Sequence, residues 1–231
     1  MQGLFVTATD TGVGKSVLSA CLIAAMRAEG LAVAAYKPVL TGTDEPPEGP
    51  WPSDDELLAS ASGEDPSRVA PLRFQPAVSP HLAAQLAGAQ IDPQALLARA
   101  RSRAGDAADV LVVEGVGGLL VPLAGAYSVR DLAAALGLPV VIAARPGLGT
   151  INHTLLTLQS ARAAGLDVRA VVLTPWSDAP SEMERSNRET IAELGAIDVR
   201  VLPAVDAPSA ELLAGAGAVL PWRAWLGSSS F

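Results

Sequence analysis

The sequence of 231 residues has almost no cysteine: Cys21 stands alone, so the chain can form no internal disulfide and has no cysteine cluster for zinc. It also has no apolar run that reaches the roughly 18 residues of a membrane-spanning helix. The first residues lack the basic segment and the apolar stretch of a secretory signal peptide. Together these absences predict a protein of the reducing cytoplasm that does not bind a membrane.

Positive charge is scarce as well, with 16 lysines and arginines against 24 aspartates and glutamates, and the net charge is −8. An acidic chain with a pI near 4.7 is repelled by nucleic acid and by anionic membranes, so neither is expected as a partner. A small anionic ligand is still allowed, because a local site can be positive on an acidic protein. Half of the residues are apolar and 17% are charged, which is typical of a folded domain.

Lysine is rarer still, since only Lys15 and Lys37 occur among the 16 basic residues. All the other basic positions carry arginine, so this sequence uses arginine wherever a solvated positive charge suffices. Lysine differs in offering a compact ammonium on a flexible stem, with a pKa that shifts readily on burial. Both lysines are therefore candidates for chemistry.

Short segments of Val, Ile, Leu and Ala alternate with helical patterns along the chain. Strands that are apolar throughout are buried on both faces, so this order predicts a mainly parallel β-sheet covered by helices on both faces. No repeat and no long linker divides the sequence, and we expect one α/β domain over residues 1–225 with a short frayed tail at 226–231. Strands are expected at 3–7, 31–36, 110–113, 139–144, 168–173 and 199–202, helices at 16–29, 54–61, 92–104, 128–136, 150–164 and 180–194, and irregular chain at 41–53 and 64–80.

A glycine-rich turn joins the first expected strand to the first expected helix and reads Ala-Thr-Asp-Thr-Gly-Val-Gly-Lys-Ser at 8–16. Gly12 and Gly14 allow the backbone N–H groups to point at phosphate oxygens, and the helix N-terminus adds partial positive charge. Lys15 is placed to reach the β- and γ-phosphates, and the Ser16 hydroxyl to bind Mg²⁺. The G-x-x-x-x-G-K-[ST] pattern is missed only at Thr9. The sequence therefore predicts a P-loop NTPase domain that binds a Mg²⁺–nucleoside triphosphate.

Two acidic positions are candidates for the metal, because Mg²⁺ takes oxygen ligands, often one or two carboxylates with phosphate oxygens. Glu114 directly follows the expected strand at 110–113, and the glycines of the next segment, Gly-Val-Gly-Gly, allow the backbone to approach a ligand closely. Asp54 opens a helix, where an acid can also act as a cap. Asp55 is its neighbour, so the assignment stays open between the two, with Asp54 preferred.

Lys37 follows the second expected strand, in the segment Tyr-Lys-Pro-Val-Leu-Thr-Gly-Thr, so it faces the same edge of the sheet as the glycine-rich turn. Its ammonium is placed there to contact a γ-phosphate or to neutralise an anion during phosphoryl transfer. Thr41, four residues on, is a candidate to hydrogen-bond a substrate. The proline-rich stretch at 44–53 has no interpretation beyond that of a lid.

A second strand-to-helix turn reads Gly-Leu-Gly-Thr-Ile-Asn-His at 147–153. Its backbone N–H groups are placed to hold a substrate carboxylate. We interpret His153 as a helix residue bonded to a neighbour. His81, in Ser-Pro-His at 79–81, either lines a pocket or begins a helix. Neither histidine is assigned as a general base.

Taken together, these segments resemble the dethiobiotin synthetase family. The matching stretches are Thr-Asp-Thr-Gly-Val-Gly-Lys-Ser, Tyr-Lys-Pro-Val with Thr-Gly after it, Ser-Pro-His, Val-Glu-Gly-Val-Gly-Gly-Leu and Leu-Gly-Thr-Ile-Asn-His, and the likeness covers residues 2–205. The resemblance implies a Mg²⁺-dependent ligase that closes the ring of dethiobiotin from 7,8-diaminononanoate (7,8-diaminopelargonic acid) and CO₂, or bicarbonate as its source, while ATP becomes ADP and phosphate. It implies a carbamate, then a carbamic–phosphoric mixed anhydride, and a homodimer with the Asn152 turn of one subunit at the substrate carboxylate of the other.

The resemblance also implies a set of site residues. Lys37 and Lys15 are expected to be catalytic, and Ser16, Asp54 and Glu114 to hold the metal. Expected nucleotide contacts are Gly12, Val13, Gly14, Lys15, Ser16, Val17, Asp54, Glu114, Gly115, Val116, Gly117, Thr174 and Glu211, and expected substrate contacts are Thr41, Ser79, Gly149, Thr150 and Asn152.

Two departures from the family pattern bear on the nucleotide. Ala8 replaces the usual glycine at the start of the loop, and it is small enough to be tolerated. Thr174 stands where adenine-selecting members often have asparagine, so a preference for ATP over other nucleoside triphosphates stays open. Glu211 matches a family acid near the ribose or base only loosely.

Two rival interpretations remain. A nucleotide switch regulated by a protein partner is disfavoured, because the ATPases that position plasmids and cell-division proteins carry an additional loop lysine where this chain has Thr9, Asp10 and Thr11. A related amide-forming ATPase, such as the amidating enzymes of corrinoid synthesis, is the second rival. Those enzymes use a cysteine nucleophile in a glutamine-hydrolysing domain, and Cys21, in the helix after the loop, cannot fill that role.

Overall fold

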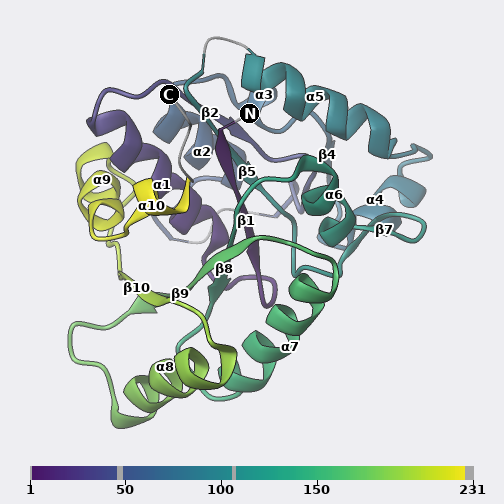
Figure 1. The fold of residues 1–231 in the computed structure, drawn as a ribbon. Helices are drawn as coiled ribbons and strands as arrows, with labels where there is room; N and C mark the ends of the chain where they lie inside the picture. Colours follow the sequence, from purple (N-terminus) through teal and green to yellow (C-terminus); the bar gives the residue numbers. More distant parts are fainter. Residues whose placement is uncertain (1, 46–48, 106–107, 227–231) are drawn as a thin grey trace.

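The computed structural model describes residues 2–45, 49–105 and 108–226. Its centre is a six-stranded sheet in the order β10-β9-β8-β1-β5-β2, in which every pairing is parallel. Figure 1 shows the strands passing through the middle of the molecule between helices, so the predicted α/β domain with a mainly parallel sheet is confirmed. The strands are β1 (Gly3–Ala8), β2 (Val33–Tyr36), β5 (Val110–Glu114), β8 (Val140–Ala144), β9 (Val168–Trp176) and β10 (Val199–Pro203).

Successive residues of each strand point into two separate cores, one on each face of the sheet. In β1, Val6 packs into one core and Phe5 into the other, and both side chains are fully buried. The helices that cover the first face are α1 (Lys15–Ala28), α2 (Asp54–Ser62), α9 (Ala210–Ala218) and α10 (Trp222–Trp225). Those on the second face are α5 (Pro93–Gly105), α6 (Val129–Leu136), α7 (Thr150–Ala163) and α8 (Glu182–Gly195). None of the described helices is long and apolar enough to cross a membrane.

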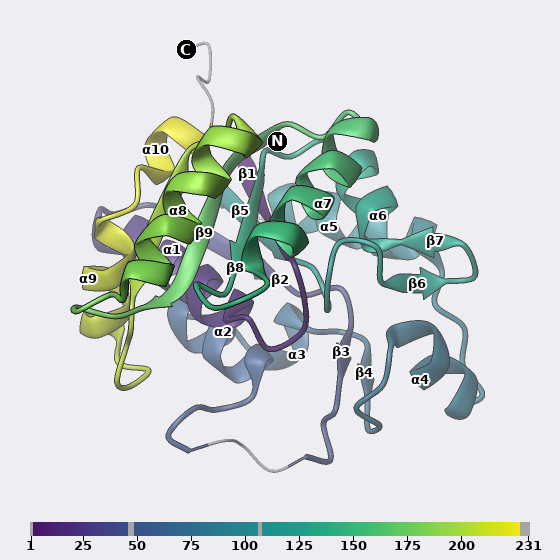
Figure 2. The same cartoon turned by 90° about the horizontal axis from the view of Figure 1, so that it is seen from below.

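Several small elements lie outside the main sheet, and they correct the expectation that 64–80 is irregular. This segment contains α3 (Pro66–Val69), β4 (Arg73–Phe74) and the first residue of α4 (Pro80–Leu86). Figure 2 shows β4 beside β3 (Leu40–Thr41), with α4 next to them and with the pair of β6 (Pro122–Ala124) and β7 (Tyr127–Ser128) above. Elements of two to seven residues are too short to show a periodic pattern, so sequence reasoning missed them.

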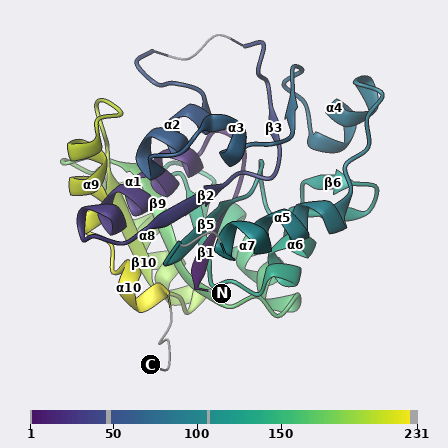
Figure 3. The ribbon, with the colours of Figure 1, turned by 90° about the horizontal axis from the view of Figure 1, so that it is seen from above.

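The helices after β10 were also not expected, and α9 is the one with the clearest structural role. It packs along α1 (Figure 3), and a Cβ placed on Gly217 would lie 2.0 Å from the carbonyl oxygen of Cys21. The two helix backbones therefore touch at a position that only glycine allows. Leu226 is still buried in this core, while the rest of the expected tail, 227–231, lies outside the described residues.

At the outer edge of β2, one of the two outermost strands of the sheet, the backbone groups of Ala35 are satisfied by side chains. The backbone N–H of Ala35 donates to Glu64 at 2.9 Å, and the carbonyl oxygen of Ala35 accepts from Arg103 at 3.0 Å. Glu64 and Arg103 also form an ion pair at 2.5 Å. At Ala35, one pair of opposite charges thus supplies the two hydrogen bonds that a neighbouring strand would otherwise make.

The contact between α1 and α9 predicts opposite effects for one substitution at two nearby positions. Gly217→Ala should lower the free energy of unfolding by about 1–3 kcal/mol, because the new methyl group overlaps the Cys21 carbonyl. Gly215→Ala should raise it by roughly 0.5–1 kcal/mol, because the Cβ meets no neighbour and alanine favours the helix. Urea unfolding of both variants tests this, and destabilisation of equal size at the two positions would contradict the close contact.

Candidate active site

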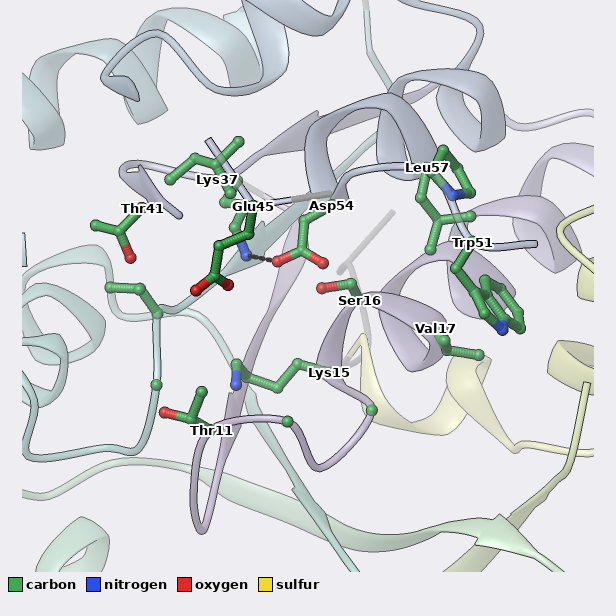
Figure 4. Close-up of a pocket in the computed structure, with 16 residues that line it drawn as sticks. Thr11, Lys15, Ser16, Val17, Lys37, Thr41, Glu45, Trp51, Asp54 and Leu57 are labelled. Atoms are coloured by element: carbon green, nitrogen blue, oxygen red, sulfur yellow. Dashed lines mark ion pairs between the residues drawn. The ribbon is translucent and has the colours of Figure 1, made fainter. Parts of the chain in front are cut away.

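A cavity of about 410 Å³ opens at the carboxyl ends of β1, β2 and β5. The sheet order places β1 beside β5 and β5 beside β2, so the segments that follow these three strands meet at one edge. The loop after β1, Lys37 just after β2, and Glu114 at the end of β5 all reach this edge. Figure 4 shows Lys15, Ser16, Lys37 and Asp54 pointing into the same space.

The glycine-rich loop has the backbone that the sequence predicts for a phosphate cradle. Gly12 and Gly14 both have left-handed backbones, with φ of 68° and 91°. Gly14 is the N-cap of α1, where no side chain accepts a hydrogen bond from the first turn and no acidic residue lies. The N–H groups of that turn therefore point into the cavity edge without a side-chain partner, which suits an anion.

Lys15 adds a buried positive charge to this cradle. Its side chain is only 7% exposed, and its Nζ donates to the carbonyl oxygen of Asp10 at 3.4 Å within the same loop. Burial lowers the pKa of its ammonium, and the neighbouring charge of Lys37 lowers it further. No carboxylate among the described residues forms an ion pair with Lys15, so its charge is left for an anionic ligand.

Lys37 is at the centre of a cluster of charges. Its Nζ donates to Oε1 of Glu114 at 2.6 Å and lies 2.8 Å from Oδ2 of Asp54. Ser16 donates from Oγ to the same Oε1 at 2.8 Å. Burial alone would lower the pKa of Lys37, but the two carboxylates outweigh it and hold that pKa above the ordinary lysine value.

Glu114 provides the test of whether these residues suit a divalent cation. Its side chain is 1% exposed, and Oε2 is buried without a hydrogen-bond partner among the described residues. A buried carboxylate oxygen is rarely left alone, so this atom is suited to a ligand that is absent from a protein-only structure. Together with the Asp54 carboxylate and the Ser16 hydroxyl, it forms an oxygen set of the kind that Mg²⁺ binds alongside phosphates.

The two neighbouring aspartates at the start of α2 point in different directions. Asp54 lines the cavity with a side chain that is 44% exposed, and Lys37 and Ser16 hold its pKa below the ordinary value despite the opposing effect of burial. Asp55 is completely buried, accepts from Ser53 Oγ at 2.7 Å and pairs with Arg73 at 2.6 Å. The geometry thus favours Asp54 as a metal ligand, and Asp55 has a structural role.

Some of the expected contacts line this cavity and others do not. Thr41, Val17, Val116 and Gly117 line it, while Val13 is buried within the loop. A Cβ on Gly115 would lie 2.8 Å from Val129, so close packing explains this glycine.

The remaining expected residues lie apart from the cavity lining. Thr174 is buried beneath the loop, with its Cγ2 3.1 Å from where a Cβ on Gly14 would stand. Ser79 occupies the N-cap position of α4 without a side-chain capping bond, and Glu211 is exposed in the first turn of α9. Asn152 is exposed in the first turn of α7, after Gly149 as N-cap and the buried Thr150, so the single chain does not bring this turn to the cavity.

Sequence reasoning missed three contributors to the site. Trp51 and Glu45, on either side of the segment 46–48 that lies outside the described residues, both line the cavity, as Figure 4 shows. Arg145, just after β8, donates from Nη2 to the carbonyl oxygen of Thr11 at 3.0 Å and so braces the loop from outside. A lone tryptophan in a proline-rich stretch was a usable signal, whereas nothing in the sequence distinguishes Arg145 from the other arginines.

The environment of Cys21 also bears on the rival glutamine-hydrolysing interpretation. Its side chain is fully buried in α1, and burial raises the pKa of its thiol to about 12. A nucleophilic cysteine needs an accessible thiolate. This residue therefore serves the packing of the core.

The chain is similar to several curated proteins named ATP-dependent dethiobiotin synthetase BioD. It is 45% identical to the protein of Anaeromyxobacter sp. (strain K) over 205 residues, covering 84% of this chain and 90% of the other. The values are 40% with Mycobacterium avium (strain 104), covering 88% of each chain, and 37% with Bacillus subtilis (strain 168), covering 86% and 85%. A family model described as "AAA domain" matches residues 2–209.

Solved structures with low sequence identity have the same fold. The Aquifex aeolicus complex of the cell division proteins MinC and MinD contains a chain that aligns with a TM-score of 0.57 at 13% identity, covering 100% of this chain and 98% of that one. A ParA family ATPase from Chlorobium tepidum aligns with a TM-score of 0.53 at 14% identity, covering 96% and 93%. At this identity the likeness supports the fold alone.

The opposite directions of the two aspartates predict two different defects from the same substitution. Asp54→Asn should weaken Mg²⁺-dependent nucleotide binding and change the free energy of unfolding by no more than about 1 kcal/mol, because its carboxylate is half exposed. Asp55→Asn should cost about 2 kcal/mol of stability, because it removes the charge that pairs with Arg73 and weakens the hydrogen bond from Ser53, and should leave metal-dependent binding intact. Urea unfolding with calorimetric nucleotide titration would separate them, and loss of metal dependence in Asp55→Asn alone would reverse the assignment.

Proposed function

The chain belongs to the family of ATP-dependent dethiobiotin synthetases, and we propose on that basis that it closes the ureido ring of dethiobiotin from 7,8-diaminononanoate and CO₂, with ATP cleaved to ADP and phosphate. The structural observation that carries the proposal is the presence of two buried lysines in one cavity at the phosphate loop. A substrate carbamate and a triphosphate repel each other, so a site that joins them needs concentrated positive charge.

The proposed reaction has three steps. One amine of the substrate adds to CO₂ and loses a proton, which gives a carbamate. A carbamate oxygen attacks the γ-phosphorus, the bond to the β–γ bridging oxygen breaks, and ADP leaves behind a carbamic–phosphoric mixed anhydride. The second amine then attacks the carbamate carbon, loses a proton and expels phosphate, which closes the ring.

The lysines divide the work of offsetting charge in these steps. Lys15, within the loop, contacts the β- and γ-phosphates, since no carboxylate of the described residues forms an ion pair with it. Lys37, at the opposite side of the cavity, neutralises the carbamate and the phosphoryl group in transfer. Thr41, which lines the same cavity, hydrogen-bonds the substrate.

Mg²⁺ is proposed as the cofactor, held by Ser16, Asp54 and Glu114. The partnerless Oε2 of the buried Glu114 supports this assignment. The cation supplies charge neutralisation at the phosphate oxygens. The remaining work of orientation falls to the loop backbone and the two lysines.

Nucleotide choice is proposed to be relaxed. Thr174 replaces the amide that would read the adenine edge, and it packs under Gly14 instead of standing in the open. Glu211, exposed at the start of α9, is proposed to lie near the ribose or base. Other purine and pyrimidine triphosphates are therefore expected to support turnover.

The proposed partner is a second copy of the chain, in the cytoplasm. Leu148, in the turn before α7, is 93% exposed, and Leu156, in the middle of α7, is 56% exposed. Leu156 lines a hollow of about 400 Å³ between α7 and the outer side of the phosphate loop. Exposed leucines beside a site favour an interface. Such an interface would bring the Asn152 turn to the substrate carboxylate in the partner's site. No side chain caps the helix N-terminus at this turn.

Phosphate release is the direct test of the proposed reaction. With Mg²⁺–ATP, release should require both bicarbonate and 7,8-diaminononanoate, because the carbamate is the nucleophile. Lys37→Ala should bind the nucleotide but lose most turnover. Release that ignores the diamine would overturn the biosynthetic proposal and point to a nucleotide switch, and repetition with CTP and GTP measures nucleotide choice.

The proposed dimer predicts a loss of association from one surface substitution. Leu148→Asp should give particles with the mass of one chain, 23.5 kDa, where the unaltered protein has twice that mass. It should also raise KM for the diamine more than KM for ATP, because only the substrate carboxylate is contacted across the interface. Leu194→Asp, at an exposed leucine on α8, is the matched control and should remain dimeric. Light scattering after gel filtration measures this, and a dimeric Leu148→Asp would place the interface elsewhere.

A further inference from the structure

The ammonium of Lys37 lies among the groups proposed to hold the metal. It is 2.6 Å from Oε1 of Glu114 and 2.8 Å from Oδ2 of Asp54. Ser16 donates to the same Oε1. The side chains of Glu114, Asp54 and Ser16 therefore converge on one small region, which the ammonium of Lys37 already occupies.

Buried carboxylates need a positive partner whether or not a metal is bound. Glu114 is 1% exposed, so leaving it uncompensated would be costly, and Lys37 supplies the compensation in the metal-free protein. Mg²⁺ binds carboxylate oxygens at about 2.0–2.1 Å and demands near-octahedral geometry. An ammonium touching the same two carboxylates occupies ligand positions that the cation needs, and the two like charges repel each other strongly at such short range.

We propose that Lys37 and Mg²⁺ exchange places: the lysine pairs with Glu114 and Asp54 in the metal-free protein, and the incoming cation displaces it toward the reacting groups. This inference rests on the proposed function of the site. The ammonium that neutralises the carbamate then becomes available only once the metal–nucleotide has bound. The metal would thus release Lys37 from its carboxylate partners, in addition to its role at the phosphates.

In the alternative arrangement, the cation binds without displacing Lys37. A cation could bind Oε2 of Glu114, which has no partner among the described residues, while Lys37 stays on Oε1. In that case the lysine would keep its contacts in every state. The proposal and this alternative differ in the environment of one ammonium group, which a spectroscopic measurement can follow without turnover.

The scarcity of lysine makes that measurement simple. Side-chain ¹⁵N-lysine labelling should give two ammonium signals, from Lys15 and Lys37, and Lys37→Arg assigns them. Spectra are recorded without ligand, with the β,γ-imido analogue of ATP in EDTA, and with the analogue and Mg²⁺. The Lys37 signal should persist in the first two states and shift or broaden through faster hydrogen exchange only with Mg²⁺.

The outcomes are distinguishable from one another. An unchanged Lys37 signal in the presence of Mg²⁺, with Lys15 shifted, overturns the exchange while leaving nucleotide binding intact. No response of Lys15 to the Mg²⁺–analogue would instead count against the proposed nucleotide site. A Lys37 shift caused by the analogue in EDTA would assign the displacement to the phosphates and overturn the role of the metal.

A titration with Mn²⁺, followed by the electron paramagnetic resonance of the free ion, tests the same exchange on variants without nucleotide. Lys37→Met removes the competitor and should tighten Mn²⁺ binding by about tenfold or more, as expected for loss of a like charge at contact distance. Lys15→Met removes an equal charge that touches neither carboxylate, so it should tighten binding less than about threefold. Equal effects in the two variants would mean general electrostatics and overturn direct competition. If Lys37→Met does not fold, the spectra of the unaltered protein still decide.

Discussion

The burial of Glu114 at the end of β5 is the constraint on which the site depends. A carboxylate with 1% of its side chain exposed can persist only beside a compensating charge, and Lys37 provides it across the gap between two neighbouring strands. The parallel register makes this possible, since Tyr36 pairs with Val113 and Val6 with Glu114. Lys37, Glu114 and the start of the phosphate loop therefore leave the sheet side by side. The ligand cavity follows from how three strands end.

The strands of the main sheet were predictable because apolar residues dominate each of them, as in Val110–Val113, even where β9 and β10 each contain one arginine. The order of those strands was not predictable from the same patterns. The contact between Lys37 and Glu114 joins residues 77 positions apart, and it exists because β5 lies between β1 and β2. Helix α9 escaped notice because its sequence, with Gly215 and Gly217, has weak helix propensity and owes its place to packing on α1.

The sequence motifs identified most residues of the candidate site, but they did not show where the side chains of those residues lie. Asp54 and Asp55 are indistinguishable as letters, yet one helix step of roughly 100° turns one to the cavity and the other to Arg73. Motif spacing identified the Asn152 turn but could not show that it lies on the outside of the chain. Glu45 and Trp51 flank a proline-rich segment, where no periodicity guides a prediction. Geometry that depends on side-chain direction needs the fold.

The side chains along β2 have a consequence for the behaviour of the protein at high concentration. The outermost strand of an open sheet is a template for strand addition by another molecule, which is how folded proteins begin to form fibrils. At the middle of β2, both hydrogen-bonding groups of Ala35 are already taken by Glu64 and Arg103. A foreign strand would have to break a largely buried ion pair before it could hydrogen-bond to Ala35. The ion pair of Glu64 and Arg103 thus also opposes aggregation through this edge of the sheet.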